Sequence, residues 1–426
     1  MARNKVLALI LAGGAGSRLD ALTEERAKPV LPFAGVYRLI DFALSNCMHS
    51  GIPDVWIIEQ YLPHSLNDHL ANGRPWDLDR TYGGLKVLPP FEGSADADGG
   101  FAEGNADAIY RHKDFIREFA PDILLVLSAD HIYKLDFGKV IEHHLERNAD
   151  VTMVTTRVPI EDASRFGTIE ADEEGRVTNF AYKIKNPTSD LATTEVFVYN
   201  AHKFLETLDQ LAAEGSSKKV GGDKKKKEAG AKLKDFGNEL LPRLVKNGRA
   251  FEYRFTEYWR DVGTVESYWQ SHMDLLEHEP LFALDDPRWP ILTYGSQRLP
   301  ARIHKSARIE NSLIAPGCTV RGHVIDSVLA PGVVIEAGAV VSRSVLLHNT
   351  IVAANARIDC AILDEEVHVE EKAVIGKQSN TTAASRRKCS SSDIALIGRT
   401  ARIPAGKRIA AGARIKSRKQ DHSTKS

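Results

Sequence analysis

Aliphatic residues recur at intervals of six through the last third of the sequence. One series is Leu329, Ile335, Val341 and Leu347, and a second is Val334, Val340, Leu346, Val352 and Ile358. A six-residue period winds short parallel strands into a solenoid, with one aliphatic side chain per hexad pointing inward. Residues that tolerate a left-handed backbone are expected at the corners, here Gly317, Gly332, Gly338 and Asn349. The pattern predicts a β-helix over 301–426, in which 401–415 resumes the repeat after a loop at 377–393.

The preceding part of the chain alternates strand-like and helix-like segments. The expected strands are 6–11, 55–59, 123–128, 151–158, 194–199 and 251–255, and the expected helices are 38–50, 106–119, 138–147 and 201–213. This alternation predicts an α/β domain over 1–280 with a mostly parallel sheet, an architecture typical of nucleotide binding. A break at 215–234, which contains four consecutive lysines, reads as a solvated insertion, and a proline-punctuated linker follows at 281–300.

Composition excludes several classes of protein. Lys and Arg number 56 against 57 Asp and Glu, so no basic field points to nucleic acid or an anionic membrane. The longest apolar run near the start, 6–12, is far short of the ~18 residues of a membrane span, and a signal peptide fits it less well than a buried strand. The four cysteines are widely spaced without a C-x-x-C pair, so we expect neither a disulfide framework nor a zinc site, and a cytoplasmic location.

A glycine-rich turn follows the first expected strand. The strand ends at Leu11 and Ala12, and the turn contains Gly13, Gly14, Gly16 and Ser17. Glycines at such a place let backbone N–H groups close around phosphate oxygens at the start of a helix. The turn is neither a Walker loop nor a dinucleotide fingerprint, because the cations Arg18 and Lys28 come next. Fixed positive charge of this kind suits a triphosphate whose pyrophosphate leaves.

Six segments together resemble one enzyme family. Besides the glycine turn with AKP at 27–29, they are YRLIDFALSN at 37–46, PWDLDR at 75–80, GNADA at 104–108, SADHIY at 128–133 and YWRDVGT at 258–264. In order and spacing they resemble the glucose-1-phosphate adenylyltransferases. The resemblance implies a Rossmann-like nucleotidyltransferase domain followed by a left-handed β-helix. It also implies Mg²⁺, a homotetramer or homodimer, a role in glycogen biosynthesis, and in-line attack of a sugar 1-phosphate on ATP or another nucleoside triphosphate.

The resemblance also implies roles for individual residues. Asp130 and Asp261 match the two carboxylates that hold the metal, and Arg18, Lys28 and Asp130 match catalytic positions. The bound nucleotide is expected along the glycine turn and at Gly104 and Asn105. The sugar phosphate is expected at Tyr182, Lys183, Thr193, Glu195 and Arg260. Each could instead have a structural role, such as a helix cap for Asp130 or a turn residue for Asp261. His131 reads as a packed histidine rather than a general base, because phosphate oxygens need no deprotonation.

Departures from the family pattern gather in the sugar pocket. Tyr182 stands where the family usually has Glu, Thr193 replaces Ser, and Glu195 replaces a glycine that leaves room for the sugar. Asn105 replaces a Thr beside the base. Three readings therefore stay open: synthesis of ADP-glucose; the same reaction on an amino-sugar or cyclitol phosphate, with ATP or GTP; or a non-catalytic regulatory subunit of an ADP-glucose pyrophosphorylase.

Overall fold

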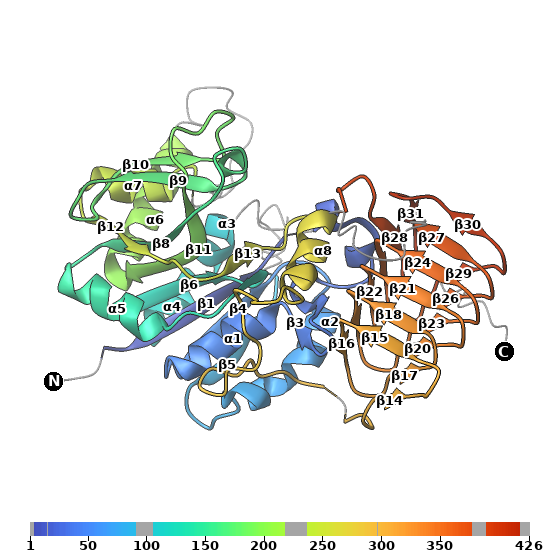
Figure 1. Ribbon diagram of the computed structural model, residues 1–426. Helices are drawn as coiled ribbons and strands as arrows, with labels where there is room; N and C mark the ends of the chain where they lie inside the picture. The colour runs from blue at the N-terminus through green and yellow to red at the C-terminus, as the bar shows by residue number, and fades with distance from the viewer. Residues whose placement is uncertain are drawn as a thin grey trace, which may run out of the picture. The chain divides into compact units, whose positions relative to one another are not determined.

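The computed structural model describes residues 4–14, 16–90, 105–217, 237–295, 297–376 and 389–417. The chain forms two compact units (Figure 1). One comprises Met1–Gly14 and Phe42–Trp259, and the other comprises Ala15–Asp41 and Arg260–Ser426. Among the described residues, none of the helices combines the length and the apolar character that a membrane span requires.

A nine-stranded sheet organises the first unit. Its main path runs β10-β9-β11-β6-β1-β4-β5, and β8 pairs with β11 and β12. The strands are β1 (Val6–Ala12), β4 (Asp54–Glu59), β5 (Gly84–Leu88), β6 (Ile123–Ser128), β8 (Val151–Arg157), β9 (Gly167–Ala171), β10 (Val177–Tyr182), β11 (Leu191–Asn200) and β12 (Ala250–Arg254). β6, β1, β4 and β5 are parallel, but β11 runs antiparallel to β6, β8 and β9. The α/β class and the expectation of a mostly parallel sheet are confirmed, because β10 and β11 are the only described strands of this sheet that run against the direction shared by the others.

Helices cover both faces of this sheet, as alternating side chains of the strands require. Met153 of β8 packs in one apolar cluster with Phe204 of α6 (Ala201–Ser217) and Leu244 of α7 (Leu240–Lys246). Thr152 points to the opposite face, where its hydroxyl lies 2.9 Å from Nδ1 of His144 in α5 (Phe137–Glu146). The sheet is therefore the middle layer of three, which buries strands that read as continuous apolar runs.

The observed helices differ from the expected ones at identifiable places. The expected helix 106–119 is two helices, α3 (Asn105–Arg111) and α4 (Lys113–Phe119), because the backbone of His112 leaves the helical region. α6 extends to Ser217, and most of the predicted break after it lies outside the described residues. The other helices are α1 (Ile40–His49), α2 (Pro63–Leu70) and α8 (Val265–Asp274), of which sequence periodicity predicted only α1.

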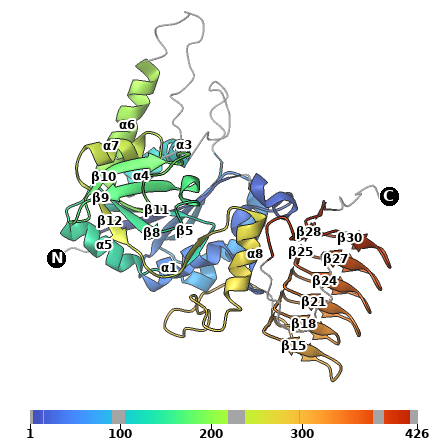
Figure 2. The same cartoon turned by 45° about the horizontal axis from the view of Figure 1, so that its top comes forward.

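The second unit contains the predicted β-helix. Three parallel six-stranded sheets form its faces, and Figure 2 shows β15, β18, β21, β24, β27 and β30 stacked in one of them. The strands are β14 (Arg302–Ile303), β15 (Arg308–Glu310), β16 (Leu313–Ile314), β17 (Thr319–Val320), β18 (His323–Ile325), β19 (Val328–Leu329), β20 (Val334–Ile335), β21 (Val340–Ser342), β22 (Val345–Leu346), β23 (Ile351–Val352), β24 (Arg357–Asp359), β25 (Ala361–Leu363), β26 (His368–Val369), β27 (Val374–Gly376), β28 (Ala395–Ile397), β29 (Arg402–Ile403), β30 (Arg408–Ile409) and β31 (Arg414–Ile415). β29 to β31 confirm that 401–415 resumes the repeat.

The strand register in the β-helix shows that the inward-pointing residues do not recur at strict intervals of six. Ser342 of one coil stacks on Asp359 of the next, a separation of 17 residues, so this coil takes two hexads and one segment of five, whereas Arg308 and His323 of an earlier coil are 15 residues apart. Ile335, Val341, Leu346, Val352 and Ile358, drawn from both predicted series, follow this spacing and are fully buried. Val334 and Val340, one residue out of step, are only partly buried.

Left-handed backbone at the corners is confirmed. Gly317, Gly332, Gly338 and Asn349 all have positive φ, between 57° and 81°. A Cβ on Gly332 would collide with Oδ1 of Asn349, which stacks above it in the next coil. Glycine at 332 is therefore required both by its dihedral angles and by the close approach of the neighbouring corner.

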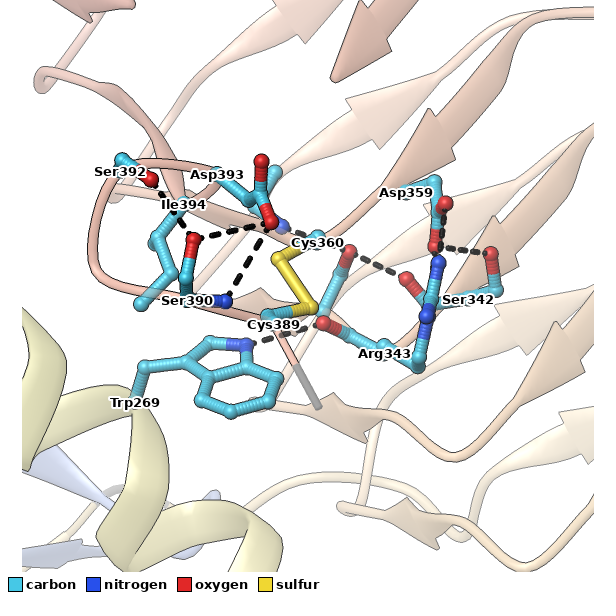
Figure 3. The surroundings of a disulfide bond; sticks show 12 residues. Trp269, Ser342, Arg343, Asp359, Cys360, Cys389, Ser390, Ser392, Asp393 and Ile394 are labelled. Carbon is cyan, nitrogen blue, oxygen red and sulfur yellow. Dashed lines mark hydrogen bonds and ion pairs between the residues drawn. A yellow bond between two sulfur atoms is a disulfide. The ribbon is translucent and has the colours of Figure 1, made fainter. Parts of the chain in front are cut away.

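A disulfide joins Cys360 to Cys389 (Figure 3). Cys360 lies between β24 and β25, and Cys389 precedes β28, which pairs with β25. The expectation of no disulfide is therefore wrong, because the coil brings together two cysteines that are 29 residues apart in the sequence. Nearby, the indole of Trp269 in α8 donates a hydrogen bond to the carbonyl oxygen of Arg343 at 2.9 Å. Among the described residues, Cys47 and Cys318 are free and buried.

Candidate active site

The glycine turn that follows β1 requires its glycines. Gly14 and Gly16 have positive φ. A Cβ on Gly13 would lie 2.5 Å from Oε1 of Gln60, and one on Gly16 would lie 2.9 Å from Cγ2 of Thr23. The segment after the turn is a short 3₁₀ helix, Ser17–Thr23, with non-helical backbone at Asp20. The helix expected directly after the turn is therefore not an α-helix in this described segment.

Asp130 follows β6, the strand beside β1 in the middle of the sheet. The amide of Ala129 donates to the carbonyl of Leu11, which brings residue 130 to the end of β1 where the glycine turn begins. The hydroxyl of Ser128 donates to Oδ1 of Asp130. Ligands of open α/β sheets bind at such carboxyl ends of parallel strands. Asp130 therefore has the location that a catalytic carboxylate needs.

His131 is a packed residue, as predicted. Its side chain is buried at the start of β7 (His131–Tyr133), with Nδ1 3.0 Å from the carbonyl oxygen of Thr194. Its ring meets the indole of Trp259 edge to face, with centroids 5.2 Å apart. These contacts position the segment that carries Asp130.

Asp261 lies near two predicted cations, Arg18 and Lys28, in the second unit. A Cβ on Gly263 would lie 2.8 Å from Oδ2 of Asp261 and 3.3 Å from Nη2 of Arg18. Nζ of Lys28 lies 3.9 Å from Oδ1 of Asp261, and the two side chains are only 10% and 15% exposed. Arg18 is exposed and approaches the same glycine as Asp261. Two cations near one carboxylate, of which Lys28 and Asp261 are largely removed from water, suit a magnesium-bearing polyphosphate.

α8 begins directly after this group. Thr264 caps the helix: its hydroxyl accepts from the amide of Ser267 at 3.1 Å, and Oγ of Ser267 accepts from the amide of Thr264 at 3.0 Å. This capping box determines where β13 (Trp259–Asp261) ends and the helix starts. Arg260, expected at the sugar phosphate, instead pairs with Asp274 at the end of α8.

Three of the residues expected at the sugar, Tyr182, Lys183 and Thr193, lie around Gly167 of β9. Tyr182 pairs with Gly167 in the sheet, and the hydroxyl of Thr193 donates to the carbonyl of Gly167 at 3.2 Å. The backbone amide of Lys183 donates to the carbonyl of Phe166 at 3.0 Å, and its ammonium lies 4.8 Å from the centroid of the Tyr182 ring. Glu195 is within an irregularity of β11, where the register with β8 shifts between Thr193 and Phe197.

Trp259 is a residue whose role sequence reasoning missed. Its ring contacts both Phe166, at 5.3 Å, and His131, so it joins the Gly167 group to the segment of Asp130. The indole N–H is buried and has no hydrogen-bond partner among the described residues. The only signal in the sequence was its place inside the segment 258–264. Gly104, and the side chain of Asn105, lie outside the described residues.

Known families match both parts of the chain. A family described as nucleotidyl transferase matches residues 7–278, and one described as GlmU-like C-terminal hexapeptide matches residues 299–397. The chain is 39% identical to a glucose-1-phosphate adenylyltransferase of Bacillus thuringiensis over 379 residues, which cover 89% of this chain and 96% of that protein. It is 36% identical to the enzyme of that name from Acetivibrio thermocellus over 410 residues, or 96% and 92% of the two chains.

Proposed function

The chain belongs to the glucose-1-phosphate adenylyltransferase family and is a sugar-phosphate nucleotidyltransferase, and we propose that it joins ATP to a hexose 1-phosphate with release of pyrophosphate. The placement of two cations, Arg18 and Lys28, near the carboxylate of Asp261 is the observation that carries the proposal. A site with two cations beside one carboxylate fits a polyphosphate better than an uncharged ligand.

In the proposed mechanism a phosphate oxygen of the sugar attacks the α-phosphorus of ATP in line. The bond from that phosphorus to the β-phosphate oxygen breaks, and pyrophosphate leaves with the electron pair. Catalysis of this kind depends on positioning and on neutralising charge. Arg18 and Lys28 supply fixed positive charge, and the contact of Lys28 with Asp261 orients its ammonium before substrate binds.

Asp130 and Asp261 are the proposed ligands of Mg²⁺. Their oxygen atoms are the hard donors that this cation prefers, and when bound Mg²⁺ would supply positive charge against the phosphates. Asp261 is two residues from Trp259, whose ring contacts that of His131, so the chain itself limits how far Asp261 can lie from Asp130.

The proposed substrates also suggest a location, a pathway and an assembly state for the enzyme. We propose a cytoplasmic enzyme of glycogen biosynthesis that assembles as a homodimer or homotetramer and acts without nucleic acid or membrane. Its near-zero net charge of -1 supports the absence of polyanionic partners. The wide spacing of the cysteines was one argument for a cytoplasmic location, and the disulfide between Cys360 and Cys389 removes that argument.

Pyrophosphate release from the purified full-length chain tests the proposal. We expect turnover with ATP, a hexose 1-phosphate and Mg²⁺, loss of turnover after chelation of the metal, and loss of at least about a thousandfold in kcat for Asp130→Ala. Asp114→Ala is the matched control, because that carboxylate is 85% exposed and lies on α4. Absence of turnover with every nucleoside triphosphate and sugar phosphate would reject catalysis by this chain. Equal loss in the Asp114 and Asp130 variants would reject the role of Asp130.

A further inference from the structure

The carboxylate of Glu365 lies among four basic side chains of the second unit. Its Oε1 is 3.4 Å from Nη1 of Arg26 and 4.0 Å from Nη2 of Arg38. The same oxygen is 3.6 Å from Nδ1 of His348, and Oε2 is 3.5 Å from Nη2 of Arg399. Burial lowers the pKa of His348 to about 3, so that imidazole is neutral at pH 7. One largely buried carboxylate therefore serves three guanidiniums.

Two of these guanidiniums belong to the segment that carries Lys28. Arg26 precedes Lys28 by two residues, and Arg38 ends the same segment. Regular structure between them is confined to three short elements: the 3₁₀ helix η2 (Lys28–Val30) and the strands β2 (Pro32–Phe33) and β3 (Tyr37–Arg38). Elements this short supply few backbone hydrogen bonds. The position of the Lys28 backbone thus depends on what the neighbouring side chains contact.

Two further ion pairs attach this segment to the β-helix. Oε2 of Glu25 is 3.8 Å from Nη1 of Arg399, and Oδ2 of Asp20 is 3.6 Å from Nε of Arg414 in β31. All four of these side chains are at least 33% exposed, so water weakens both pairs. Glu365 is only 16% exposed, and charges removed from water attract more strongly. The group around Glu365 is therefore the stronger ionic anchor of the segment.

The carboxylate that meets Lys28 is attached to the same β-helix. Asp261 precedes α8, whose Trp269 donates its indole N–H to the carbonyl oxygen of Arg343 at 2.9 Å (Figure 3). Lys28 is attached on its own side through the contacts of Glu365. The distance of 3.9 Å between Nζ of Lys28 and Oδ1 of Asp261 thus joins two segments that the β-helix holds separately.

We propose that Glu365 is a positioning residue for nucleotidyl transfer, which acts from the β-helix by holding Arg26 and Arg38 so that the ammonium of Lys28 faces the triphosphate. This inference rests on the proposed function, because it takes Lys28 as a cation that binds the triphosphate. Without the carboxylate, three guanidiniums repel one another and the segment shifts. A shift of about 1 Å in a group that positions substrate can lower the rate about 100-fold.

A double-mutant cycle with Lys28 tests this role. Glu365→Gln and Glu365→Ala should each lower kcat for pyrophosphate release by roughly 10- to 100-fold. The KM for the sugar phosphate should not change, because the lost interaction serves the transition state. Lys28→Ala combined with Glu365→Gln should be no slower than Lys28→Ala alone, to within about twofold, since Glu365 acts through Lys28. A general loss of structure would instead multiply the two effects.

Formate supplies a second readout, which a purely structural role would not affect. Glu365→Ala leaves room for a small carboxylate beside Arg26 and Arg399. Added formate should raise kcat of Glu365→Ala by at least about fivefold, the effect of restoring a hydrogen bond between charged groups. It should not raise kcat of the wild type or of Lys28→Ala.

Glu371→Ala is the matched control, because Glu371 is an exposed carboxylate of the same β-helix. It should keep the wild-type kcat and melting temperature. If Glu365→Ala does not fold, Glu365→Gln alone decides through the double-mutant cycle. Wild-type turnover in the Glu365 variants, losses that multiply with that of Lys28→Ala, or a folded Glu365→Ala that formate does not restore overturns the inference and leaves the proposed function intact. Absence of pyrophosphate release by the wild type overturns both.

Discussion

Replacement of Asp364 by Asn should destabilise the second unit, because it removes one partner of a buried ion pair. Oδ1 of Asp364 lies 2.5 Å from Nη2 of Arg26, and the two side chains are 0% and 7% exposed. Burial raises the pKa of Asp364 above its usual range, so its charged form depends on the guanidinium. Burial alone would lower the pKa of Arg26, but the charges of Asp364 and Glu365 raise it.

The size of the effect follows from what remains after the substitution. Asn has nearly the volume of Asp, so no cavity forms, and the whole loss comes from a buried guanidinium without its closest partner. Breaking such a pair costs about 3–5 kcal/mol. Glu365 stays 3.4 Å from Nη1 of Arg26 and retains part of the attraction, so we expect about 3 kcal/mol. For a unit of this size that corresponds to a fall of roughly 6–12 °C in melting temperature.

Differential scanning calorimetry at neutral pH measures this fall. Asp190→Asn is the matched control: its pair with Arg157 is 39% and 64% exposed, and its loss should cost under about 1 kcal/mol. The double variant Arg26→Met with Asp364→Leu should recover most of the stability, because it removes both buried charges. The reasoning is refuted if Asp364→Asn melts within about 2 °C of Asp190→Asn.

Three further substitutions probe other parts of the fold. Cys389→Ala should lower the free energy of unfolding by about 3–4 kcal/mol, because the disulfide closes a loop of 29 residues. Dithiothreitol should lower the melting temperature of the wild type but not that of the variant. Burial lowers the pKa of His272 to about 4, so the unfolded chain binds a proton that the folded protein does not. The free energy of unfolding should therefore fall as the pH drops from about 6.5 towards 4. His272→Phe should flatten that pH profile, whereas His64→Phe, at an exposed histidine, should not. Thr264→Ala should cost about 1 kcal/mol in urea unfolding and Thr264→Ser much less, and equal losses would contradict the capping role.

Local chemistry was sufficient for much of this molecule. A buried apolar run followed by a glycine turn predicts β1 and the tight turn after it, since glycine permits the left-handed backbone that Gly14 and Gly16 adopt. The six-residue period predicts the β-helix, because only a coiled parallel arrangement buries one aliphatic side chain per hexad. The resemblance in the segments with Asp130 and Asp261 likewise points to nucleotidyl transfer before any coordinates are known.

Tertiary structure alone decided which distant residues meet. Sequence spacing argued against a disulfide, yet stacking of β28 on β25 brings Cys389 beside Cys360. The antiparallel turn-back of β9 and β10 depends on pairing with β11, which local propensity does not specify. Glu195 reads in the sequence as a simple replacement of glycine, and only the folded chain shows its left-handed backbone. The physical reason is the same in each case: contacts between residues far apart in the sequence depend on packing and register, which short-range patterns do not encode.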